Sequence, residues 1–513
     1  MDSDRIRCPS LTNTIMTTQF IKWGILATTA TGLLVLPACT DLEIEEVDSI
    51  IVEDDGSGQT AGDPAQLVES VYNGLSTFTD QANTYSLFEH PSDELIPPTR
   101  GVDWGDNGVW RTLHAHTWDA THAQVLNAWN TLNSRIFNTA EILAANPNAE
   151  QEAHGRFLQG FFMWHVLDLY GVVPFREFEQ GVDELPRVIS RSDAIDQAIS
   201  QVEASIANLP SAGPGENIQG TKAAAYSMLT RMYLNKAVYK ASDPAGPYEH
   251  NPDDLQKVID YADMVTAEGY SFDPNYFEIF EAGSDNEPIL VSNQGTPQNR
   301  WMMTLHYSQN PSGWNGFTTL ADFYNSFDPN DPRIGREPTP DGTASSGIGV
   351  GFLQGQQVTD NGETLIDGRT QQPLVFTEEV DLAGVPTNAG VRVIKYHPAR
   401  SGKYILIRYA ESQLNKAEAQ LRLGDAAGAL ETVNAMRTTR GTPALSSIDL
   451  DGMLMERGFE LYWEGLRRTD QVRFGTFTDT WDHKTVTDPT RVLFPIPQQA
   501  LDSNPNLTQN PGY

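Results

Sequence analysis

Apolar residues recur every three or four positions through much of this chain, and that spacing predicts amphipathic helices. The clearest example runs from Tyr404 to Arg422, where the residues that would share one buried face are Leu406, Ala410, Leu414, Ala417 and Leu421. Gly424 can adopt the left-handed conformation that ends this helix, and Asp425 can cap the next one. The helix after Asp425 has its apolar residues at Ala426, Leu430, Val433 and Met436.

These two predicted helices would form an antiparallel hairpin. A short Leu-Gly-Asp connection joins them, and the small side chain of Ala429 would lie where they cross. This pattern is typical of a tetratricopeptide-type hairpin. A third helix is predicted from Met455 to Arg468, with Glu464 and Arg468 four residues apart on its exposed side, where they could pair.

Further helices are predicted upstream of this hairpin. Asp63-Pro64 has the form of a helix start, in which a capping residue precedes a first-turn proline. Helical spacing marks the segments 63–75, 125–143, 152–170, 195–209, 221–240 and 255–268. Together with the C-terminal hairpin, these segments predict a mainly α protein built on a tetratricopeptide-like scaffold of helix pairs.

Helical spacing lapses in two long segments. Residues 82–121 are rich in Gly, Asp, Trp and His, and a loop region of this length is uncommon unless it is functional. Residues 271–401 are dominated by Gly, Pro, Asn and Thr, with short extended runs at 374–376 and 391–394. We therefore expect a helical region at 63–270, a loop-rich second lobe at 271–401 with short helices and small β-strand pairs, and a C-terminal helical region at 402–513.

Sequence blocks near the end of the chain have a specific order. They are Arg408-Tyr409-Ala410-Glu411, the run from Arg457 to Arg468, Phe494-Pro495-Ile496-Pro497, and Gln509-Asn510-Pro511-Gly512-Tyr513. In this order they resemble the C-terminal region of the SusD/RagB family, the surface glycan-binding lipoproteins of Bacteroidetes. The resemblance implies a SusD-like fold and a partnership with a SusC-like TonB-dependent transporter of the outer membrane. It leaves the identity of the glycan open.

The start of the chain resembles a bacterial lipoprotein signal. Lys22 precedes an apolar run that ends in Leu36-Pro37-Ala38-Cys39, so residues 1–38 would be removed and Cys39 would carry lipid. A buried cysteine or a membrane-spanning anchor is the alternative, but the apolar run is short for a span. Translation from Met16 instead of Met1 would give a more typical signal length. Residues 39–62 are acidic and read as a flexible tether, and the family resemblance implies export to the cell surface.

Charge and cysteine content narrow the class of protein. The chain has 34 Lys and Arg against 68 Asp and Glu, a net charge of −34, which disfavours binding to nucleic acid and to polyanionic polysaccharides. Its only cysteines are Cys8 and Cys39, so a disulfide framework is excluded. With 513 residues, the chain exceeds what one hydrophobic core usually holds, so a composite domain or two lobes is expected.

The segment from Pro98 to Trp110 has the composition of a sugar-binding loop. Flat aromatic rings can pack on the C–H face of a sugar, while Asp, Asn and Arg form hydrogen bonds with its hydroxyl groups. Glycines in the loop would let a ring be exposed. The residues predicted to contact glycan are Arg100, Asp103, Trp104, Asp106, Asn107 and Trp110, and the family resemblance supports Trp104 and Asn107. Trp129, on a helix face, is expected in the core, and Trp118 fits either role.

A second aromatic segment lies in the loop-rich lobe. It includes Asn299-Arg300-Trp301 and Gly313-Trp314-Asn315-Gly316. Trp301 and Trp314 are predicted to form the other side of an aromatic platform, although both could also pack in the core. Tyr307 and Tyr324 are further aromatic candidates in this lobe.

Other groups of residues indicate no cofactor. His114, His116 and His122 have no acidic or cysteine partner at ligand spacing, so no metal site is predicted. The run from Asp328 to Arg333 is expected to form a turn. Phosphate-binding glycine loops, nucleophile elbows and zinc motifs are not found in the sequence.

The sequence therefore predicts a lipid-anchored, non-enzymatic protein of the outer membrane surface. It would capture a neutral oligo- or polysaccharide, with a β-1,3-glucan such as laminarin as the best choice, and deliver it to the transporter. Two alternatives remain open. Asp93-Glu94 or Asp103 and Asp106 could be the carboxylate pair of a surface glycoside hydrolase, and the helical scaffold could instead bind peptides.

Overall fold

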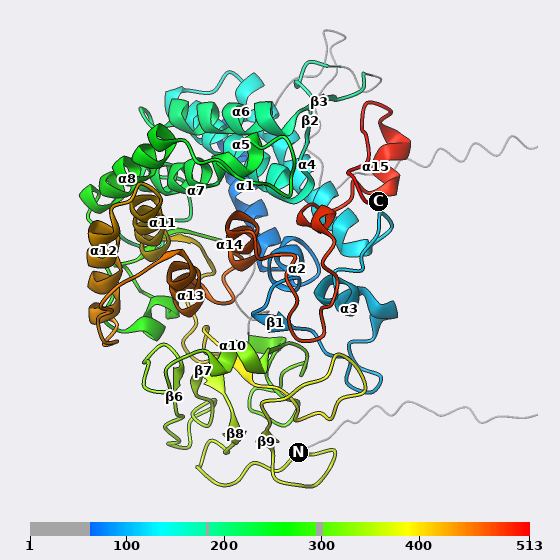
Figure 1. The fold of residues 1–513 in the computed structure, drawn as a ribbon, viewed down its shortest axis with the longest axis vertical. Helices are drawn as coiled ribbons and strands as arrows, with labels where there is room; N and C mark the ends of the chain where they lie inside the picture. Colours follow the sequence, from blue (N-terminus) through cyan, green and yellow to red (C-terminus); the bar gives the residue numbers. More distant parts are fainter. Residues whose placement is uncertain (1–61, 181–183, 294–300) are drawn as a thin grey trace, which may run out of the picture. The chain divides into compact units, whose positions relative to one another are not determined.

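The computed structural model describes residues 62–180, 184–293 and 301–513 (Figure 1). The described residues all belong to one compact unit. The predicted signal peptide at 1–38, Cys39 and nearly all of the predicted tether lie outside the described residues, as do Asn299 and Arg300.

Helices dominate the described residues, which confirms the prediction of a mainly α fold. The N-terminal part contains α1 (Pro64–Asn73), the 3-10 helix η1 (Gly74–Thr79), α2 (Thr84–Glu89), η2 (Asp106–Gly108), α3 (Val109–His114), α4 (Ala123–Ala144), α5 (Ala149–Tyr170), α6 (Arg191–Ser205), α7 (Lys222–Lys240) and α8 (Pro252–Ala267). After them come η3 (Tyr276–Phe280), α10 (Ala321–Asn325), α11 (Tyr409–Arg422), α12 (Ala426–Thr439), α13 (Leu450–Leu461), α14 (Arg467–Phe474), η4 (Pro489–Val492) and α15 (Gln498–Ser503). Among the described residues, none of the helices has both the length and the apolar composition needed to cross a bilayer.

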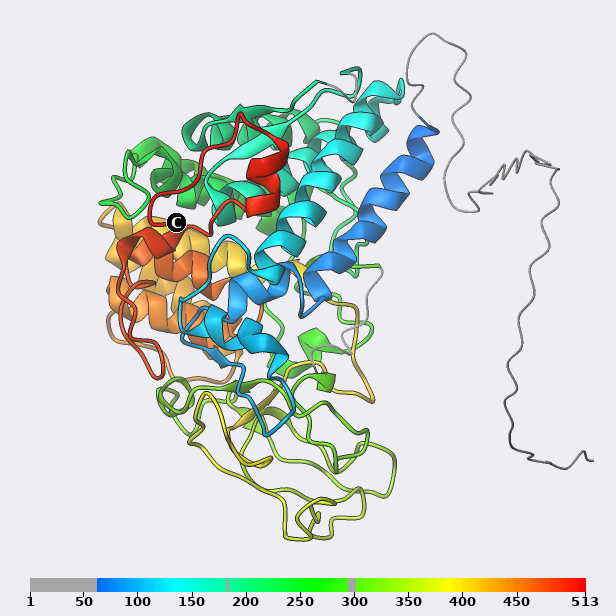
Figure 2. The same ribbon diagram turned by 90° about the vertical axis from the view of Figure 1, so that its right-hand side faces the viewer.

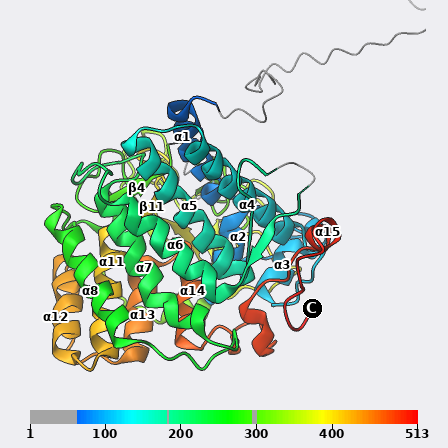
Figure 3. The ribbon, with the colours of Figure 1, turned by 90° about the horizontal axis from the view of Figure 1, so that it is seen from above.

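The long helices form a continuous row. Each of α4, α5, α6, α7 and α8 packs on the next, and α8 then packs on α11, which packs on α12. Figure 3 shows this row from above, running from α4 to α12. This repeated packing of neighbouring helices is the scaffold that the helical spacing predicts.

Helix ends follow the capping residues in the sequence. The Asp63 carboxylate accepts a hydrogen bond from the N–H of Ala65 at 2.9 Å, and Pro64 occupies the first turn of α1. Between α11 and α12, Gly424 has a φ of +86°. The Asp425 carboxylate then caps α12 by accepting from the N–H of Gly428 at 2.9 Å.

The prediction of one continuous helix from Met455 to Arg468 is wrong, because the helix is interrupted near the middle of this segment. Helix α13 ends at Leu461, and α14 begins at Arg467. Between them, Trp463 and Gly465 have φ values of +58° and +79°, which an α-helix cannot contain. The chain therefore turns sharply at this point.

Because of this turn, Glu464 and Arg468 do not form the predicted surface pair. Glu464 accepts hydrogen bonds from Arg408 at 2.7 Å and from Lys395 at 2.6 Å. Arg468 is fully buried and binds the Asp168 carboxylate at 2.8 Å. Both charged side chains have partners far away in the sequence, which helical spacing does not reveal.

The strands are short and pair antiparallel. The pairs are β1 (Leu95–Ile96) with β5 (Thr318–Thr319), β2 (Val173–Phe175) with β3 (Arg187–Ile189), β4 (Pro288–Val291) with β11 (Ile405–Arg408), and β8 (Gly355–Gln356) with β9 (Val375–Phe376). The three remaining strands form one sheet in the order β10 (Arg392–Ile394), β7 (Val350–Leu353), β6 (Gly335–Arg336). The prediction of small strand pairs in a loop-rich segment is confirmed. The views in Figures 1 and 2 show that segment gathered at one end of the helical part.

One strand pair connects the two segments that the sequence analysis singled out. In β1–β5, Leu95 is opposite Thr319 and Ile96 is opposite Thr318. Strand β1 belongs to residues 82–121, which also contain the short helices α2 and α3. The pairing brings the tryptophan-rich segment onto the loop-rich segment.

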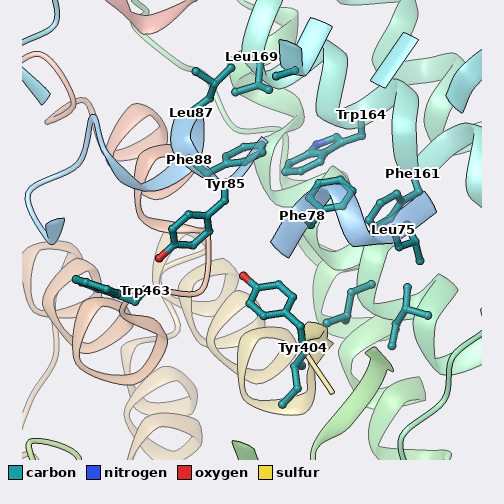
Figure 4. Packing of buried hydrophobic residues seen from close by; sticks show 14 of the residues in the cluster. Leu75, Phe78, Tyr85, Leu87, Phe88, Phe161, Trp164, Leu169, Tyr404 and Trp463 are labelled. Carbon is teal, nitrogen blue, oxygen red and sulfur yellow. The ribbon is translucent and has the colours of Figure 1, made fainter. Parts of the chain in front are cut away.

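The described residues contain two hydrophobic clusters: a large one that joins the N-terminal helices, the loop-rich segment and the C-terminal end, and a smaller one among α11, α12 and α13. Figure 4 shows Phe88 of α2 beside Trp164 of α5, while the ring of Tyr85, also from α2, points toward Tyr404 and Trp463 of the C-terminal part. These side chains are all nearly excluded from solvent. Side chains from the N-terminal and C-terminal helical regions therefore pack together in one compact unit.

Buried charges join the loop-rich segment to the helices. The Glu460 carboxylate at the end of α13 lies 2.9 Å from Arg408, 2.7 Å from Arg440 and 3.3 Å from Arg333. Glu287 also binds Arg408, at 3.1 Å. We call these five residues the Glu460 cluster, and each of their side chains is at most 2% exposed.

Burial alone would raise the pKa of Glu460. The attraction of Arg440, Arg408 and Arg333 outweighs this effect and lowers its pKa well below the ordinary value. Glu460 is therefore ionised in the folded protein throughout the neutral range. Because its folded pKa is depressed, its contribution to stability is present above the ordinary carboxyl pKa and is lost as the pH falls.

We predict that Glu460→Gln lowers the free energy of unfolding by about 3–5 kcal/mol at pH 7, because removing one partner of a buried ion pair leaves uncompensated charge. Urea unfolding followed by circular dichroism measures the change. Asp196→Asn is the control, since its pair with Lys240 is partly exposed and is expected to contribute less than about 1 kcal/mol. Equal losses in the two variants would contradict a special role for the cluster.

Candidate functional site

The loop between β1 and α3 has an unusual backbone. Trp104, Asp106 and Asn107 have φ values of +61°, +32° and +55°. For residues with a Cβ atom, such conformations cost about 1–3 kcal/mol each, and they cluster at functional sites. Contacts from the surrounding structure must therefore hold this loop in place.

Arg100 supplies the main anchor. Its guanidinium donates to the main-chain oxygens of Pro386 and Ala389, both at 2.8 Å. Burial lowers the pKa of Arg100 to about 10, so the group stays charged at neutral pH. The side chain is only 2% exposed, which corrects the expectation that it contacts glycan: Arg100 positions the loop from below.

Trp104 and Trp314 come together from distant parts of the chain. The indole N–H of Trp104 donates to the main-chain oxygen of Trp314 at 2.9 Å, and their ring centroids lie 6.3 Å apart. Trp104 is half-buried and rests on Phe317, with a centroid distance of 4.8 Å. Trp314 is 39% exposed. We call this aromatic pair the platform.

Two other predicted tryptophans are not displayed. Trp110 is 6% exposed and lies beneath Trp104, where its indole N–H donates to the Asp106 carboxylate at 2.6 Å. Trp301 is 7% exposed and packs in the core. The expectation that these two rings face a ligand is corrected, because the surrounding apolar side chains cover them.

Trp118 and Trp129 have structural roles. Trp129 is buried in the core, as predicted. Trp118, for which both roles were open, is also buried, and its indole N–H donates to the hydroxyl of Tyr513 at 2.6 Å. Trp118 therefore holds the C-terminal end of the chain.

Gly316 allows the close approach of the two loops. A Cβ atom at this position would lie 2.4 Å from Cε2 of Trp104, a separation that real Cβ atoms do not show. The flat indole thus lies directly against the main chain of the opposing loop. This contact sets the position of the Trp104 ring.

A polar group borders the platform. The Tyr307 hydroxyl donates to Oδ2 of Asp103 at 2.5 Å, and Arg369 donates to the same oxygen at 3.0 Å. The Arg369 guanidinium also lies 3.8 Å from the centroid of the Tyr307 ring, in cation–π geometry. Asp103, Tyr307 and Arg369 are named the polar rim below.

The polar rim keeps Asp103 ionised. The hydrogen bond from Tyr307 is the largest effect on its carboxyl group and lowers its pKa, and Arg369 adds to this against a smaller opposing effect of burial. Burial and Asp103 raise the pKa of Tyr307 to about 12, so its hydroxyl stays protonated. The rim therefore offers two acceptors, the Asp103 carboxylate and the Tyr307 hydroxyl oxygen, and the remaining N–H groups of Arg369 as donors.

Asp106 and Asn107 lie exposed beside the platform. Asp106 uses one carboxylate oxygen to hold Trp110, as described above. The Asn107 side-chain amide has no hydrogen-bond partner in the described part of the chain. It can therefore both donate to and accept from a ligand hydroxyl.

Sequence reasoning missed Arg369. It stands alone in a polar turn, and neither its spacing nor its neighbours gave a signal. Its significance comes only from the position of its guanidinium over Tyr307. Asn315 was likewise assigned no role, yet it is buried and its amide donates to the main-chain oxygen of Thr387 at 2.8 Å.

The histidines of residues 114–122 bind main-chain groups. His114 contacts the oxygens of Leu95 and Asp482 at 3.1 and 2.9 Å, and His116 contacts that of Pro91 at 2.7 Å. Over residues 62–180, 184–293 and 301–513, no group of three or more side chains could hold a metal ion.

Asp93 and Glu94, the other candidate carboxylate pair of a hydrolase, both bind structural partners. Asp93 binds Arg467 at 2.7 Å. Glu94 is buried and accepts from the N–H of Trp463 at 3.0 Å, and burial followed by the nearby Glu89 raises its pKa well above the ordinary value. Neither carboxylate belongs to the platform.

Comparison with known proteins finds similarity to the SusD family. The SusD family model matches residues 279–513. The starch-binding protein SusD of Bacteroides thetaiotaomicron is 26% identical to this chain, and the alignment covers 89% of this chain and 90% of that protein. The predicted resemblance to the SusD/RagB family is confirmed.

Solved structures show the same fold. A SusD superfamily protein from Parabacteroides distasonis has a TM-score of 0.68 at 16% identity, covering 88% of this chain and 98% of that structure. A laminarin-binding SusD-like protein has a TM-score of 0.64 at 20% identity, covering 88% and 99% respectively. The predicted SusD-like architecture is therefore confirmed.

We predict that Gly316→Ala displaces the Trp104 ring, because its Cβ would overlap the indole. Near-ultraviolet circular dichroism and tryptophan fluorescence are expected to change, while the far-ultraviolet spectrum stays the same. Gly105→Ala is the matched control from the same region, since its Cβ would meet no atom closer than 3.8 Å and its φ is an ordinary −73°. Identical tryptophan spectra for wild type and Gly316→Ala would contradict the contact.

A second prediction concerns the pKa of Asp103. Tyr307→Phe is expected to raise it toward about 3.9, the ordinary value, and Arg369→Ala is expected to raise it less. Carbon-13 titration of the carboxyl groups measures both shifts. Asp119, whose pKa is lowered by Thr121, is an internal reference that should not move; an Asp103 titration unaffected by Tyr307→Phe would refute the rim geometry.

Proposed function

We propose that the protein captures a neutral oligo- or polysaccharide at the cell surface, because the SusD family model matches residues 279–513. The likeness to a starch-binding protein over most of the chain supports a glycan ligand. The fold shared with a laminarin-binding protein is compatible with the same ligand class.

The observation that carries this proposal is the platform itself. A strained loop holds Trp104 against the exposed Trp314, and hydrogen-bonding side chains surround the pair. An aromatic face can pack on the C–H groups of a sugar ring while the Asn107 amide and the polar rim bind its hydroxyls. The strain at Trp104, Asp106 and Asn107 is difficult to explain by packing alone.

Local charge favours an uncharged ligand. Asp103 and Arg369 neutralise each other at the polar rim, and the protein as a whole has a net charge of −34. A polyanion would be repelled at long range. Among neutral glycans we propose a β-1,3-glucan such as laminarin, and α-glucans of the starch type are the closest competitors.

We propose that the protein binds its glycan without cleaving it. A glycosidase needs a carboxylic acid with a raised pKa beside a second carboxylate. At the platform the pKa of Asp103 is lowered, and Asp106 is bound to Trp110. Glu94, whose pKa is raised, is buried away from the platform.

The proposal extends to location and partner by family resemblance. Lipidation at Cys39 would anchor the protein to the outer membrane, facing outward, and a SusC-like TonB-dependent transporter would receive the glycan. The tetratricopeptide-like side of the helical scaffold is our choice for the transporter-facing surface. A peptide-binding protein with this scaffold is the competing proposal, and substitutions in the platform would then leave ligand binding unchanged.

We predict that residues 52–513 bind one class of neutral oligosaccharide. Trp104→Ala and Trp314→Ala are each expected to weaken this binding by about tenfold or more, because an aromatic ring packed on a sugar resembles a buried aromatic anchor. Calorimetric titration with laminari-, malto-, xylo-, manno- and alginate oligosaccharides measures it. Trp481→Ala is the matched control, because Trp481 is half-buried like Trp104 but lies outside the platform.

The outcomes separate the candidates. Binding weakened about tenfold or more in each platform variant and unchanged in Trp481→Ala supports the proposal and names the glycan. Binding as strong as that of the wild type in both platform variants would place the ligand elsewhere. Failure of every glycan to bind the wild type would reject the proposed function, and release of reducing sugar would favour the hydrolase.

A further inference from the structure

The loop-rich segment contains a second cavity with the chemistry of a sugar site. It has a volume of about 310 Å³ and lies among α10, β6, β7 and β8, elements that Figure 1 shows together in that segment. Its lining includes Tyr324, Arg336, Glu337, Phe352, Gln354 and Gln356. None of the residues of the platform or its polar rim lines this cavity, so the two sites are separate.

Aromatic side chains form one wall of the cavity. Tyr324 is half-buried, and its ring packs edge-on against Phe352 with a centroid distance of 5.5 Å. The Tyr324 hydroxyl has no hydrogen-bond partner among the residues that the structure describes. Burial, followed by Glu378 and Glu337, raises the pKa of Tyr324, so its hydroxyl remains a donor at neutral pH.

The polar wall suits an uncharged, hydroxyl-rich ligand. The Gln354 amide can donate and accept, and the Gln356 amide can accept, which matches the hydroxyl groups of a sugar. The Gln356 amide nitrogen donates to the main-chain oxygens of Gln357 at 2.7 Å and Leu374 at 3.3 Å, which orients its carbonyl oxygen. Arg336 and Glu337 bring one charge of each sign, and in the described chain neither forms an ion pair with a neighbour.

Other cavities lack this combination. A neighbouring cavity of about 530 Å³ shares Arg336 and Glu337 but has no Phe, Tyr or Trp in its lining and adds the carboxylates of Glu278, Glu281 and Asp341. A third, between residues 242–245 and the C-terminal end, is lined largely by proline and small side chains. Of these three cavities in the described residues, the one at Tyr324 alone joins an aromatic wall to amides and balanced charge.

We propose that the Tyr324 cavity is a second binding site for the same neutral glycan. This inference rests on the proposed function and adds to it a contact outside the platform. A cavity of this size can enclose part of a chain. A polysaccharide long enough to reach both sites would be held more tightly than a short oligosaccharide, since the second contact forms within one complex.

The test separates the two sites with a short probe, laminaripentaose, or the oligosaccharide that the panel above identifies. In Trp104→Ala/Trp314→Ala, residues 52–513 are expected to keep weak binding, seen by calorimetry or by ligand-observed NMR. Adding Tyr324→Ala is expected to weaken that residual binding at least tenfold. Adding Tyr226→Ala is the matched control, because Tyr226 is another half-buried tyrosine and lies on α7, away from the cavity.

Gln356→Ala gives the same test with an exposed residue, so that loss of folding in Tyr324→Ala cannot obscure the result. The inference is overturned if the platform double variant shows no residual binding, or if Tyr324→Ala and Gln356→Ala both leave it unchanged. In either case, strong binding by the wild type would keep the proposed function intact. A wild type that binds no glycan would reject both.

Discussion

The Glu460 carboxylate meets arginines from three parts of the chain. Arg333 comes from the loop-rich segment, Arg408 from the end of β11 and Arg440 from the turn after α12. In the protein interior, an unpaired charge costs several kcal/mol, so these segments are restricted to arrangements in which all the charges are paired. The loop-rich segment has little regular structure of its own, and this cluster helps to fix it on the helices.

The platform depends on that placement. Its two tryptophans come from segments that are joined by the β1–β5 pair, by the hydrogen bond from Arg100 to the main-chain oxygen of Gly316 and by the contacts between the two loops. The Gly316 contact then leaves room for the Trp104 indole. Strand pairing, hydrogen bonds to the main chain and the space left by Gly316 thus all help to hold the two rings together.

Much of the helical scaffold could be predicted because its signals are local. Helical spacing and caps at Asp63 and Asp425 depend on residues within one or two turns. The break between α13 and α14 could not be predicted in this way, since Glu464 and Arg468 leave the helix pattern to meet distant partners. The short strand pairs were foreseen as a class, but their registers require contacts between remote segments.

For the site, composition identified Trp104 and Trp314, because aromatic residues among glycines in loops are unusual. Composition could not distinguish them from Trp110 and Trp301, whose burial depends on what packs above them. Arg369 carried no sequence signal at all, since its role follows from the ring of Tyr307 beneath it. The assignment of all these residues to glycan binding remains a prediction.

The left-handed residues of the Trp104 loop have a thermodynamic consequence. Their conformational cost is present in every unliganded molecule, so a ligand does not have to order this backbone when it arrives. Association would then resemble the docking of two preformed surfaces, with little entropy lost by the protein. A rigid surface of this kind also adapts poorly, and a glycan whose chain curves differently would be rejected by shape rather than by the loss of a particular hydrogen bond.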